Sequence, residues 1–257
     1  MQIITSTKNQ YVKQARSLAK KKFRDETGLF LVEGTNIIKD MPVQVEVEYL
    51  LATEQRADET ERFCASYSSK NSSVLAFTRA QVYYVSEEIM QYVADTVSPY
   101  GLCAICKMPK REFAMPKGNA LILDGVSDPG NLGTILRTAA ACDFLDVYLL
   151  DTADIYSPKV VRATLGGLFR VNTYQIDEKT ALELMSNTNS CVLDMGGKNI
   201  LENKPKAPVL LVAGNEAHGV RDALKKSAKN TYSLPMKNEI ESLNVAVATA
   251  VAMYQTL

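Results

Sequence analysis

The stretch DGVSDPGNLGTILRTAA, residues 124–140, directly follows the apolar run ALIL and has the layout of a buried strand, a loop and a helix. Gly125 and Gly130 are separated by four residues, as in a phosphate-binding P-loop, but Asn131 and Leu132 stand where that loop needs lysine and a hydroxyl. Without those groups it cannot hold the terminal phosphates and magnesium of a nucleoside triphosphate. The glycine spacing also fails the dinucleotide pattern G-x-G-x-x-G. The stretch therefore predicts a strand-to-helix turn, with Asn131 capping a helix from Leu132 onward.

Further apolar runs surround this stretch at the spacing of parallel strands joined by helical crossovers. They are ALILD at 120–124, LDVYLL at 145–150, VNTYQI at 171–176, SCVLDM at 190–195 and PVLLVAG at 208–214. Their alternation with helical patterns is typical of an α/β fold with a mostly parallel sheet. In open sheets of this kind ligands bind beyond the carboxyl ends of the strands. We therefore expect the functional site at the loops 124–133 and 214–220.

The front part of the chain predicts a second, smaller α/β domain. Residues 7–24 have the pattern of one amphipathic helix capped near Ser6 or Thr7. Short apolar runs follow it: LFLV near 29, VEVEYLL near 45, SVLAF near 73 and GLCAIC near 101. The stretch KMPKREFAMPKG at 107–118 has two prolines and no periodicity, which makes it the best candidate for a linker. We therefore expect an N-terminal domain at 1–106 and a C-terminal domain at 119–257.

The composition indicates a water-soluble protein with a substantial core, since 46% of the 257 residues are hydrophobic and 23% are charged. No apolar run approaches the length that spans a bilayer, and the opening residues lack a secretory signal, so we expect a cytoplasmic protein without a membrane segment. The five cysteines are odd in number and scattered. Cys103 and Cys106 form a C-x-x-C, but no second pair or histidine cluster accompanies it. We therefore expect reduced thiols and no metal site.

The formal net charge is zero, so any surface for nucleic acid must be local. The first 24 residues contain no acid and these basic residues: Lys8, Lys13, Arg16, Lys20, Lys21, Lys22 and Arg24. Taken alone, this cluster of charge slightly favours a solvated helix face over a surface that binds nucleic acid.

Three segments carry a resemblance to a known family. DPGNLGTILRTAAACDF contains Asn131, Gly133 and Arg137. VLLVAGNEAHGV at 209–220 contains Gly214, Asn215, Glu216 and Gly219, and LPMKNEIESLNVAVATAVAMY at 234–254 contains Pro235, Met236, Ser242, Leu243, Asn244 and Val245. In this order the segments resemble the three motifs of the SpoU/TrmH family of RNA ribose 2′-O-methyltransferases, in the SPOUT superfamily. SPKVVRATLGGLFRV at 157–171 is similar to a segment between the first two motifs. The resemblance covers about residues 120–257, and three ordered motifs are far more specific than one.

The resemblance implies a mostly parallel α/β catalytic domain whose C-terminal part forms a deep trefoil knot, a rare exception among folds. It also implies that the knot binds S-adenosylmethionine, and that the protein is a homodimer with the active site near the interface. The N-terminal domain resembles, on weaker motifs, the family's small substrate-binding domain, which has the α/β fold of certain ribosomal proteins. This likeness shifts the interpretation of the basic helix towards RNA, with Lys13, Arg16, Lys20, Lys21 and Lys22 as the RNA-binding candidates.

Carried onto this chain residue by residue, the motifs imply a set of site residues. The catalytic candidates are Asn131, Arg137, Glu216, Ser242 and Asn244. The cofactor candidates are Ala213, Gly214, Asn215, Gly219, Leu234, Pro235, Met236, Leu243 and Val245. Of these, Gly214 allows close backbone approach, while Leu234, Met236 and Leu243 can wall a pocket for the flat, neutral adenine.

Arg137 corresponds to the family's essential arginine, for which a general-base role has been proposed. A guanidinium holds its proton to very high pH, so we favour a clamp on the target phosphate or on the developing alkoxide. The hydroxyl proton then passes to a nearby acceptor or water, and Glu216, Ser242 and Asn244 could orient the arginine and the ribose. His218, the single histidine, stands where the family pattern does not demand one, and we interpret it as a loop residue.

The sequence thus predicts an S-adenosylmethionine-dependent RNA 2′-O-methyltransferase. We expect 23S ribosomal RNA as the substrate, because the front domain resembles ribosomal proteins. Transfer RNA is the alternative substrate. A non-catalytic RNA-binding or ribosome assembly factor is the alternative from another class, and the joint presence of the catalytic candidates argues against it.

Overall fold

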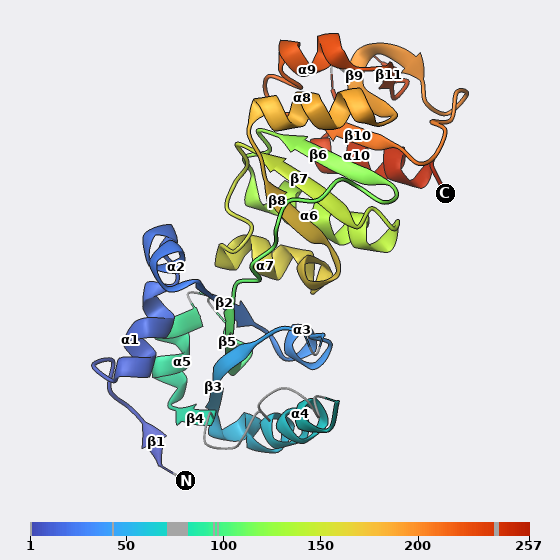
Figure 1. The fold of residues 1–257 in the computed structure, drawn as a ribbon. Coiled ribbons are helices and arrows are strands. Elements are labelled where there is room, and N and C mark those ends of the chain that lie inside the picture. The colour runs from blue at the N-terminus through green and yellow to red at the C-terminus, as the bar shows by residue number, and fades with distance from the viewer. Residues whose placement is uncertain (1, 43, 71–81, 95, 97, 239–241) are drawn as a thin grey trace. The chain divides into compact units, whose positions relative to one another are not determined.

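The computed structural model describes residues 2–42, 44–70, 82–94, 96, 98–238 and 242–257. The chain forms two compact units, one of residues 1–110 with 156–162 and the other of 111–155 with 163–257. Each unit has its own sheet with helices on both faces (Figure 1). No helix in the described ranges is both long and apolar enough to cross a membrane.

In the first unit, the described strands form a sheet in the order β1-β4-β3-β5-β2. Up to the end of β5 the elements are β1 (Ile3–Ile4), α1 (Gln10–Ser17), α2 (Lys21–Thr27), β2 (Leu29–Glu33), α3 (Thr35–Lys39), β3 (Val47–Thr53), η1 (Glu54–Arg56), α4 (Ala57–Lys70), β4 (Val82–Val85), α5 (Glu87–Ala94) and β5 (Leu102–Lys107). β5 pairs antiparallel with β2 and β3, whereas β4 pairs parallel with β3 and β1. Leu31, Leu51 and Ile105 pack in one cluster with α1 and α5, and α3 and α4 contact the same strands from the other face.

The strands expected near 29, 45 and 101 are confirmed as β2, β3 and β5. The run SVLAF near 73 lies outside the described residues. β1 and β4 were not expected, because strands of two and four residues are too short for a periodic pattern to be recognised.

The single helix predicted for residues 7–24 is wrong, because the chain forms α1 and α2 with a break between them. Asn9 rather than Ser6 or Thr7 caps α1, and its side-chain oxygen accepts from the backbone N of Tyr11 at 2.9 Å. Arg24 is only 2% exposed, and its Nη1 donates to the carbonyl of Leu18 at 2.6 Å. A buried guanidinium thus satisfies the end of α1. Arg24 therefore belongs to the core and not to the basic surface.

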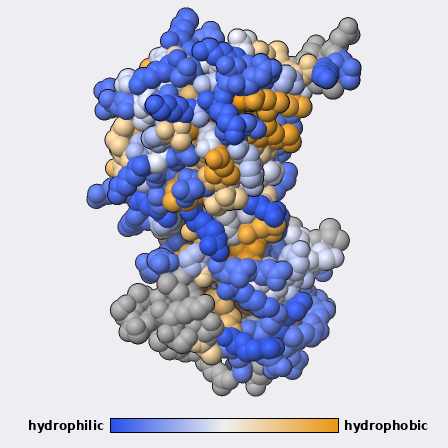
Figure 2. Space-filling view, turned by 90° about the vertical axis from the view of Figure 1, so that its right-hand side faces the viewer, coloured by the Kyte–Doolittle hydropathy of each residue, from blue (hydrophilic) through white to orange (hydrophobic). Residues whose placement is uncertain are grey.

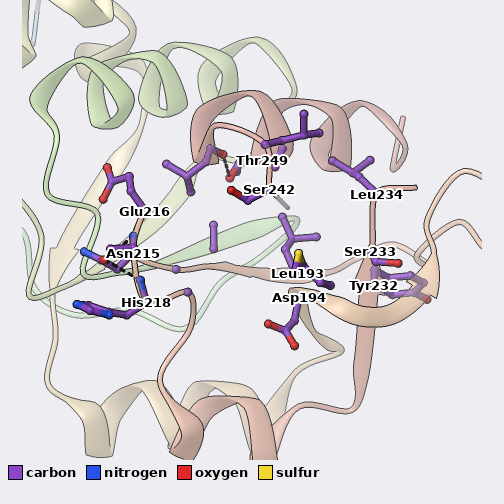
Figure 3. A pocket seen from close by; sticks show the side chains of 18 of the residues that line it. Leu193, Asp194, Asn215, Glu216, His218, Tyr232, Ser233, Leu234, Ser242 and Thr249 are labelled. Atoms are coloured by element: carbon purple, nitrogen blue, oxygen red, sulfur yellow. Dashed lines mark hydrogen bonds between the residues drawn. The ribbon is translucent and has the colours of Figure 1, made fainter. Parts of the chain in front are cut away.

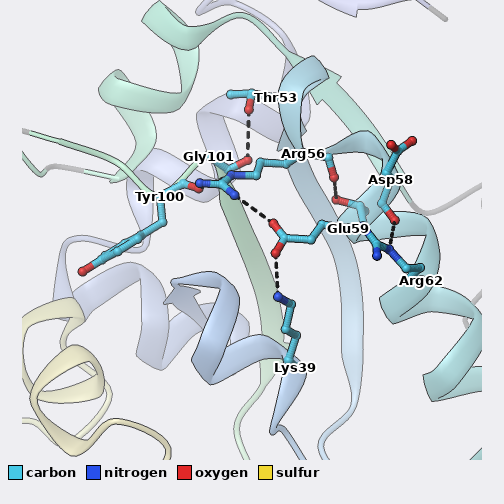
Figure 4. Close-up of polar contacts among 9 residues, drawn as sticks. Lys39, Thr53, Arg56, Asp58, Glu59, Arg62, Tyr100 and Gly101 are labelled. Atoms are coloured by element: carbon cyan, nitrogen blue, oxygen red, sulfur yellow. Dashed lines mark hydrogen bonds and ion pairs between the residues drawn. The ribbon is translucent and has the colours of Figure 1, made fainter.

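A polar network holds the segment before β5 against the start of α4 (Figure 4). Arg56 Nε donates to the carbonyl of Tyr100 at 3.1 Å, and Arg56 Nη1 donates to Glu59 Oε2 at 3.0 Å. Lys39 of α3 donates to the other carboxylate oxygen of Glu59. The hydrogen bond from Lys39 lowers the pKa of Glu59 most, and the nearby charges of Lys39 and Arg56 lower it further. The network fixes α3, η1 and α4 around one carboxylate on the surface of this unit.

In the second unit, the described strands pair in parallel throughout, in the order β11-β9-β10-β6-β7-β8. From residue 120 onward the elements are β6 (Ala120–Asp124), α6 (Pro129–Ala141), β7 (Asp146–Leu150), α7 (Pro158–Thr164), η3 (Gly167–Arg170), β8 (Asn172–Gln175), α8 (Glu178–Asn187), β9 (Ser190–Asn199), β10 (Leu210–Ala213), α9 (Asp222–Ser227), β11 (Asn230–Ser233) and α10 (Val245–Tyr254). By its contacts, α7 belongs largely to the first unit. All the strands predicted for this part are confirmed, whereas β11 was not expected.

The helices of the second unit cover both faces of its sheet (Figure 1). Ile122, Tyr148 and Val212 pack on one face with Leu184 of α8 and Leu224 of α9. On the other face α10 packs against α6 and contacts β10. Because β6 and β10 are paired neighbours, the loops that follow them begin side by side. This pairing brings the two expected functional loops together.

The helix after β6 begins earlier than predicted. Asp128, not Asn131, is the N-cap of α6: its Oδ1 accepts from the backbone N of Asn131 at 2.8 Å. Pro129 takes the first helical position, where its missing N–H costs nothing. The side chain of Asn131 therefore has no capping task and is available for contacts outside the helix.

All five cysteines are buried free thiols. Cys103 and Cys106 lie in β5, where burial raises the pKa of both thiols. Among the described residues, no group of three or more histidine, cysteine or acidic side chains could hold a metal ion.

Candidate functional site

The second motif forms a tight loop after β10. A Cβ added to Gly214 would lie 2.2 Å from the carbonyl carbon of Gly219, so only glycine fits at this position. Asn215 and Gly219 exchange backbone hydrogen bonds of 3.0 and 2.9 Å, and Gly219 has a φ of 70°. The side-chain oxygen of Asn215 accepts from the backbone N of Ala217 and His218, at 2.9 and 3.1 Å. These contacts fix the loop from within.

Asn215 also joins this loop to the first motif. Its Nδ2 donates to the carbonyl of Gly125 at 2.8 Å. Gly125 has a φ of 73°, in the left-handed region that favours glycine. Both polar atoms of the Asn215 side chain therefore hold protein backbone together.

A chain of hydrogen bonds connects residues from all three motifs. Asn131 Nδ2 donates to Glu216 Oε1 at 3.0 Å, and Asn244 Nδ2 donates to Asn131 Oδ1 at 2.8 Å. Asn244 is the N-cap of α10, and its Oδ1 accepts from the backbone N of Ala246 and Val247. Each amide is thus oriented by two partners, and the three motifs share one rigid polar connection.

Glu216 is held as a carboxylate by donors from the first motif. Ser127 donates to it through its backbone N and its hydroxyl, at 3.3 and 3.2 Å, and Asp128 donates through its backbone N at 3.2 Å. Partial burial pushes the pKa of Glu216 upward, but the hydrogen bonds from Asn131, Asp128 and Ser127 outweigh it and lower the pKa below its ordinary value. Glu216 is therefore ionised at neutral pH and cannot act there as an acid.

A cavity of about 400 Å³ lies between the second and third motifs, the middle of β9 and the end of β11 (Figure 3). Glu216, Asn215 and His218 stand on one side of it, and Tyr232, Ser233 and Leu234 stand on the opposite side. Apolar groups of the third motif and α10 line a further wall, among them Leu243, Val245 and Ala248. The wall across from Ser242 carries Asp194 of β9. The cavity therefore combines an apolar wall with several polar ends, as small-molecule sites do.

An ion-pair cluster stabilises the carboxyl ends of the strands beside the cavity. Asp124, at the end of β6, is 3% exposed. Its carboxylate accepts hydrogen bonds from the backbone N of Arg221 at 2.8 Å and from Arg221 Nε at 2.7 Å. Arg221 also pairs with Asp151 at 2.9 Å and Glu178 at 3.1 Å. Burial lowers the pKa of Arg221, but the three carboxylates raise it by more than burial lowers it. The net pKa is therefore above the ordinary value, and the guanidinium stays charged. Arg221 therefore fixes the end of the second-motif loop to the start of the first-motif loop.

The model of the SpoU rRNA methylase family matches residues 118–254. The chain belongs to the SpoU rRNA methylase family. A model of an MRM3-like substrate binding domain matches residues 9–104. The two matches fall on the two parts of the chain that carry separate sheets.

Relatives in the SpoU family are similar over most or nearly all of the chain. A Bacillus subtilis protein named 23S rRNA (guanosine(2553)-2′-O)-methyltransferase RlmP is 31% identical over 260 residues, covering 99% of this chain and 98% of the relative. The Haemophilus influenzae 23S rRNA (guanosine-2′-O-)-methyltransferase RlmB is 33% identical over 192 residues, 68% of this chain and 77% of the relative. The solved structure of an AdoMet-bound rRNA methyltransferase from Sinorhizobium meliloti is 26% identical, with a TM-score of 0.85. The match covers 99% of this chain and 97% of the Sinorhizobium chain.

Most of the candidates implied by the SpoU resemblance lie at this cavity. All the cofactor candidates line it except Pro235, which is not among its lining residues. Of the catalytic candidates, Glu216 and Ser242 line the cavity, and Asn131 and Asn244 adjoin it through the hydrogen-bond chain.

Arg137 lies on α6 with an exposed side chain. Within the described part of the chain that side chain has no hydrogen bond or ion pair. Its backbone is closely packed by η3, since a Cβ on Gly167 would lie 2.7 Å from the Arg137 Cα. The segment at 157–171 that resembles the SpoU family thus contacts the first motif.

The RNA-binding candidates of the first unit are mostly exposed. Lys13, Lys20, Lys21 and Lys22 are open to solvent. Arg16 is half-buried, and its Cζ lies 5.2 Å from the ring centroid of Tyr92.

Several residues that line the cavity were not among the site candidates of the sequence. They are Leu193, Asp194, Met195, Ala217, Lys225, Tyr232, Ser233, Ala248 and Thr249, and His218 was counted only as a loop residue. For Asp194 a signal existed, because it stands near the carboxyl end of a predicted strand. Tyr232 and Ser233 belong to the unexpected strand β11.

Proposed function

We propose that this chain transfers a methyl group from S-adenosylmethionine to a ribose 2′-hydroxyl of ribosomal RNA, 23S RNA in the first instance. The observation that carries the proposal is the hydrogen-bonded chain Glu216–Asn131–Asn244 at the edge of a nucleoside-sized cavity. Two relatives that align over most of the chain are named as 23S rRNA 2′-O-methyltransferases, which supports both the reaction and the substrate class.

The residues that line the cavity fit S-adenosylmethionine. Leu234, Leu243 and Val245 offer the apolar wall that a flat, neutral adenine needs, and the tight Gly214 loop offers backbone groups without a side chain in the way. Polar and charged groups at the remaining walls suit a ribose and an amino-acid end. S-adenosylmethionine, when bound, supplies the electrophilic methyl carbon.

Glu216, Asn131 and Asn244 act in this proposal by orientation. Their mutual hydrogen bonds hold amide and carboxylate groups at fixed positions before RNA arrives, which lowers the entropic cost of aligning the ribose hydroxyl. Ser242 lines the same cavity from the third motif and has an exposed hydroxyl that can donate to or accept from the ribose. The hydroxyl proton leaves to water or to an acceptor near the ribose.

Arg137 acts in this proposal on the RNA. Its guanidinium is exposed and uncommitted within the described residues, so it can bind the target phosphate in a bidentate way or stabilise the developing alkoxide. A general-base role would require removing a proton from a group that stays charged in proteins.

The proposed RNA-binding domain is residues 1–106, followed by a linker at 107–118 and the catalytic domain at 119–257. The match of residues 9–104 to a substrate binding domain supports this assignment. The exposed lysines of α1 and α2, with Arg16, supply the positive charge that phosphates require.

A homodimer and a knotted C-terminal segment are further parts of the proposal. α10 carries no charged residue and exposes Val247 at 52% and Tyr254 at 56%, although its other side is buried against the sheet. A helix that is apolar all round is normally covered, and a second copy of this chain is the proposed cover. Figure 2 shows hydrophobic surface on the second unit from the side where the C-terminus emerges in Figure 1.

A cytoplasmic location follows from the proposed ribosomal RNA substrate.

Ribose methylation mapped in cells with and without the gene tests the function. We expect one or a few 2′-O-methyl sites in 23S ribosomal RNA to disappear, and purified protein with S-adenosylmethionine to restore them. Loss of a site in transfer RNA instead would make transfer RNA the substrate. No lost site, together with intact RNA binding, would indicate a non-catalytic RNA-binding or assembly factor.

A further inference from the structure

Asp194 and Lys225 form an ion pair in the wall of the cavity, and neither belongs to a family motif. Lys225 Nζ lies 2.9 Å from Asp194 Oδ1, and the two side chains are 33% and 35% exposed. Both residues line the cavity. In Figure 3 the Asp194 carboxylate stands across the cavity from Ser242, below Leu193. The pair is thus a localised charge site inside an otherwise largely apolar and neutral wall.

An irregularity in β9 directs Asp194 to this position. Val192 pairs with Thr231 of β11, but the next pair joins Lys198 to Tyr232, so residues 193–197 bulge out of the ladder. A bulge of this kind re-aims side chains and is common beside functional sites. Gly197 closes the bulge against the backbone of β11, since an added Cβ would lie 2.5 Å from the Tyr232 carbonyl carbon.

Lys225 reaches the cavity from α9. Its Nζ lies near the second-motif loop, 3.8 Å from the position that a Cβ on Gly219 would take. Among the described residues, each of the two side chains has the other as its only ion-pair partner. A lysine ammonium has three donors and a carboxylate has two acceptor oxygens, so each group retains hydrogen-bonding capacity towards the cavity.

We propose that the Asp194–Lys225 pair binds the zwitterionic amino-acid end of the cofactor, with Asp194 facing its ammonium and Lys225 facing its carboxylate. The inference rests on the proposed function. Opposite charges held side by side complement a ligand whose ammonium and carboxylate share one carbon, and they disfavour a ligand without them. The apolar wall of Leu234, Leu243 and Val245 is then left for the adenine.

Calorimetry with two ligands tests this assignment. S-adenosylhomocysteine carries the amino-acid end, whereas 5′-methylthioadenosine has the same nucleoside and a thioether without it. We expect Asp194→Asn and Lys225→Gln each to weaken S-adenosylhomocysteine binding at least about tenfold, and to change methylthioadenosine affinity by less than about twofold. Lys226→Gln, an equal charge change at an exposed neighbour on the same helix that does not line the cavity, should change neither affinity.

The outcomes separate the competing explanations. An equal loss for both ligands would mean that the pair faces the ribose or only supports the fold, and would overturn the assignment. Unchanged affinity for both ligands would also overturn it. The ratio of the two affinities within one variant is independent of any misfolded fraction, so a poorly folding variant still gives an answer. A wild-type protein that binds neither ligand would refute the proposed function itself.

Discussion

The side-chain amide of Asn244 donates a 2.8 Å hydrogen bond to the side-chain oxygen of Asn131, 113 positions earlier in the chain. Asn131 in turn donates to Glu216, and Asn244 begins α10 as its N-cap. One connection therefore runs from Glu216 of the second motif through Asn131 of the first motif to Asn244 of the third motif, where α10 begins.

Asn131→Ala should lower the rate of methyl transfer at least about 100-fold, because the amide that orients Glu216 and Asn244 is lost and alignment is sensitive to small displacements. S-adenosylhomocysteine affinity should fall much less, since Asn131 does not line the cavity. Single-turnover kinetics and calorimetry give the two quantities. Full activity of the Asn131→Ala variant would show that Asn131 does not orient the catalytic groups.

Arg137→Ala should abolish detectable methyl transfer while leaving cofactor affinity and thermal stability nearly unchanged. The side chain is exposed and has no protein partner within the described residues, so its removal should not disturb the fold. His218→Ala is the comparison and should keep most of the activity. An inactive, folded His218 variant beside an active Arg137 variant would reverse the two roles.

Glu216→Gln should lower thermal stability at neutral pH, and the difference from the wild type should shrink in acid. The folded-state pKa of Glu216 lies below the ordinary 4.5, so its stabilising contribution is present above about 4.5 and is lost as the pH falls through the lowered pKa. Thermal melts of both proteins from pH 7 to pH 3 measure this. A difference in melting temperature that stays constant from pH 7 to pH 3 would mean that the charge of Glu216 contributes nothing to stability.

Replacing Lys13, Lys20 and Lys21 with glutamine should weaken RNA binding. The slope of the logarithm of RNA affinity against the logarithm of salt concentration should become shallower by up to about three, roughly one for each lost phosphate contact. Cofactor affinity should not change. The matched control neutralises Lys179, Lys204 and Lys206, which are exposed lysines of the second unit. Equal slopes for the wild type and the first variant would exclude an RNA-facing role for these lysines.

Val247→Asp should convert the proposed dimer into a monomer, because a charge on the exposed side of α10 is costly to bury between two copies. Sedimentation at several concentrations measures the mass. Lys226→Asp, a surface charge change on another helix, should leave the mass unaltered. A wild-type protein that sediments as a monomer would refute the dimer.

The sequence by itself determined every strand described in the second unit except β11, and its resemblance to the SpoU/TrmH family supplied the site candidates. Long apolar runs such as ALILD and PVLLVAG are buried on both faces, so their composition alone predicts them. Gly214 was a candidate through that resemblance, and the structure gives its physical reason: an added Cβ would lie 2.2 Å from the carbonyl carbon of Gly219, so only glycine fits.

Only the tertiary structure decided the rest. The helix predicted for 7–24 breaks between Ser17 and Lys21, and the buried Arg24 donates to the carbonyl of Leu18 at the end of the first helix. Periodicity cannot distinguish a buried guanidinium from a solvated one. Asp194 lies in the part of β9 that bulges beside β11, and it pairs there with Lys225 from α9. A sequence pattern records which side chains lie on one helix or strand face, but contacts across distant segments depend on strand order and register. Those are set by the packing of the whole unit.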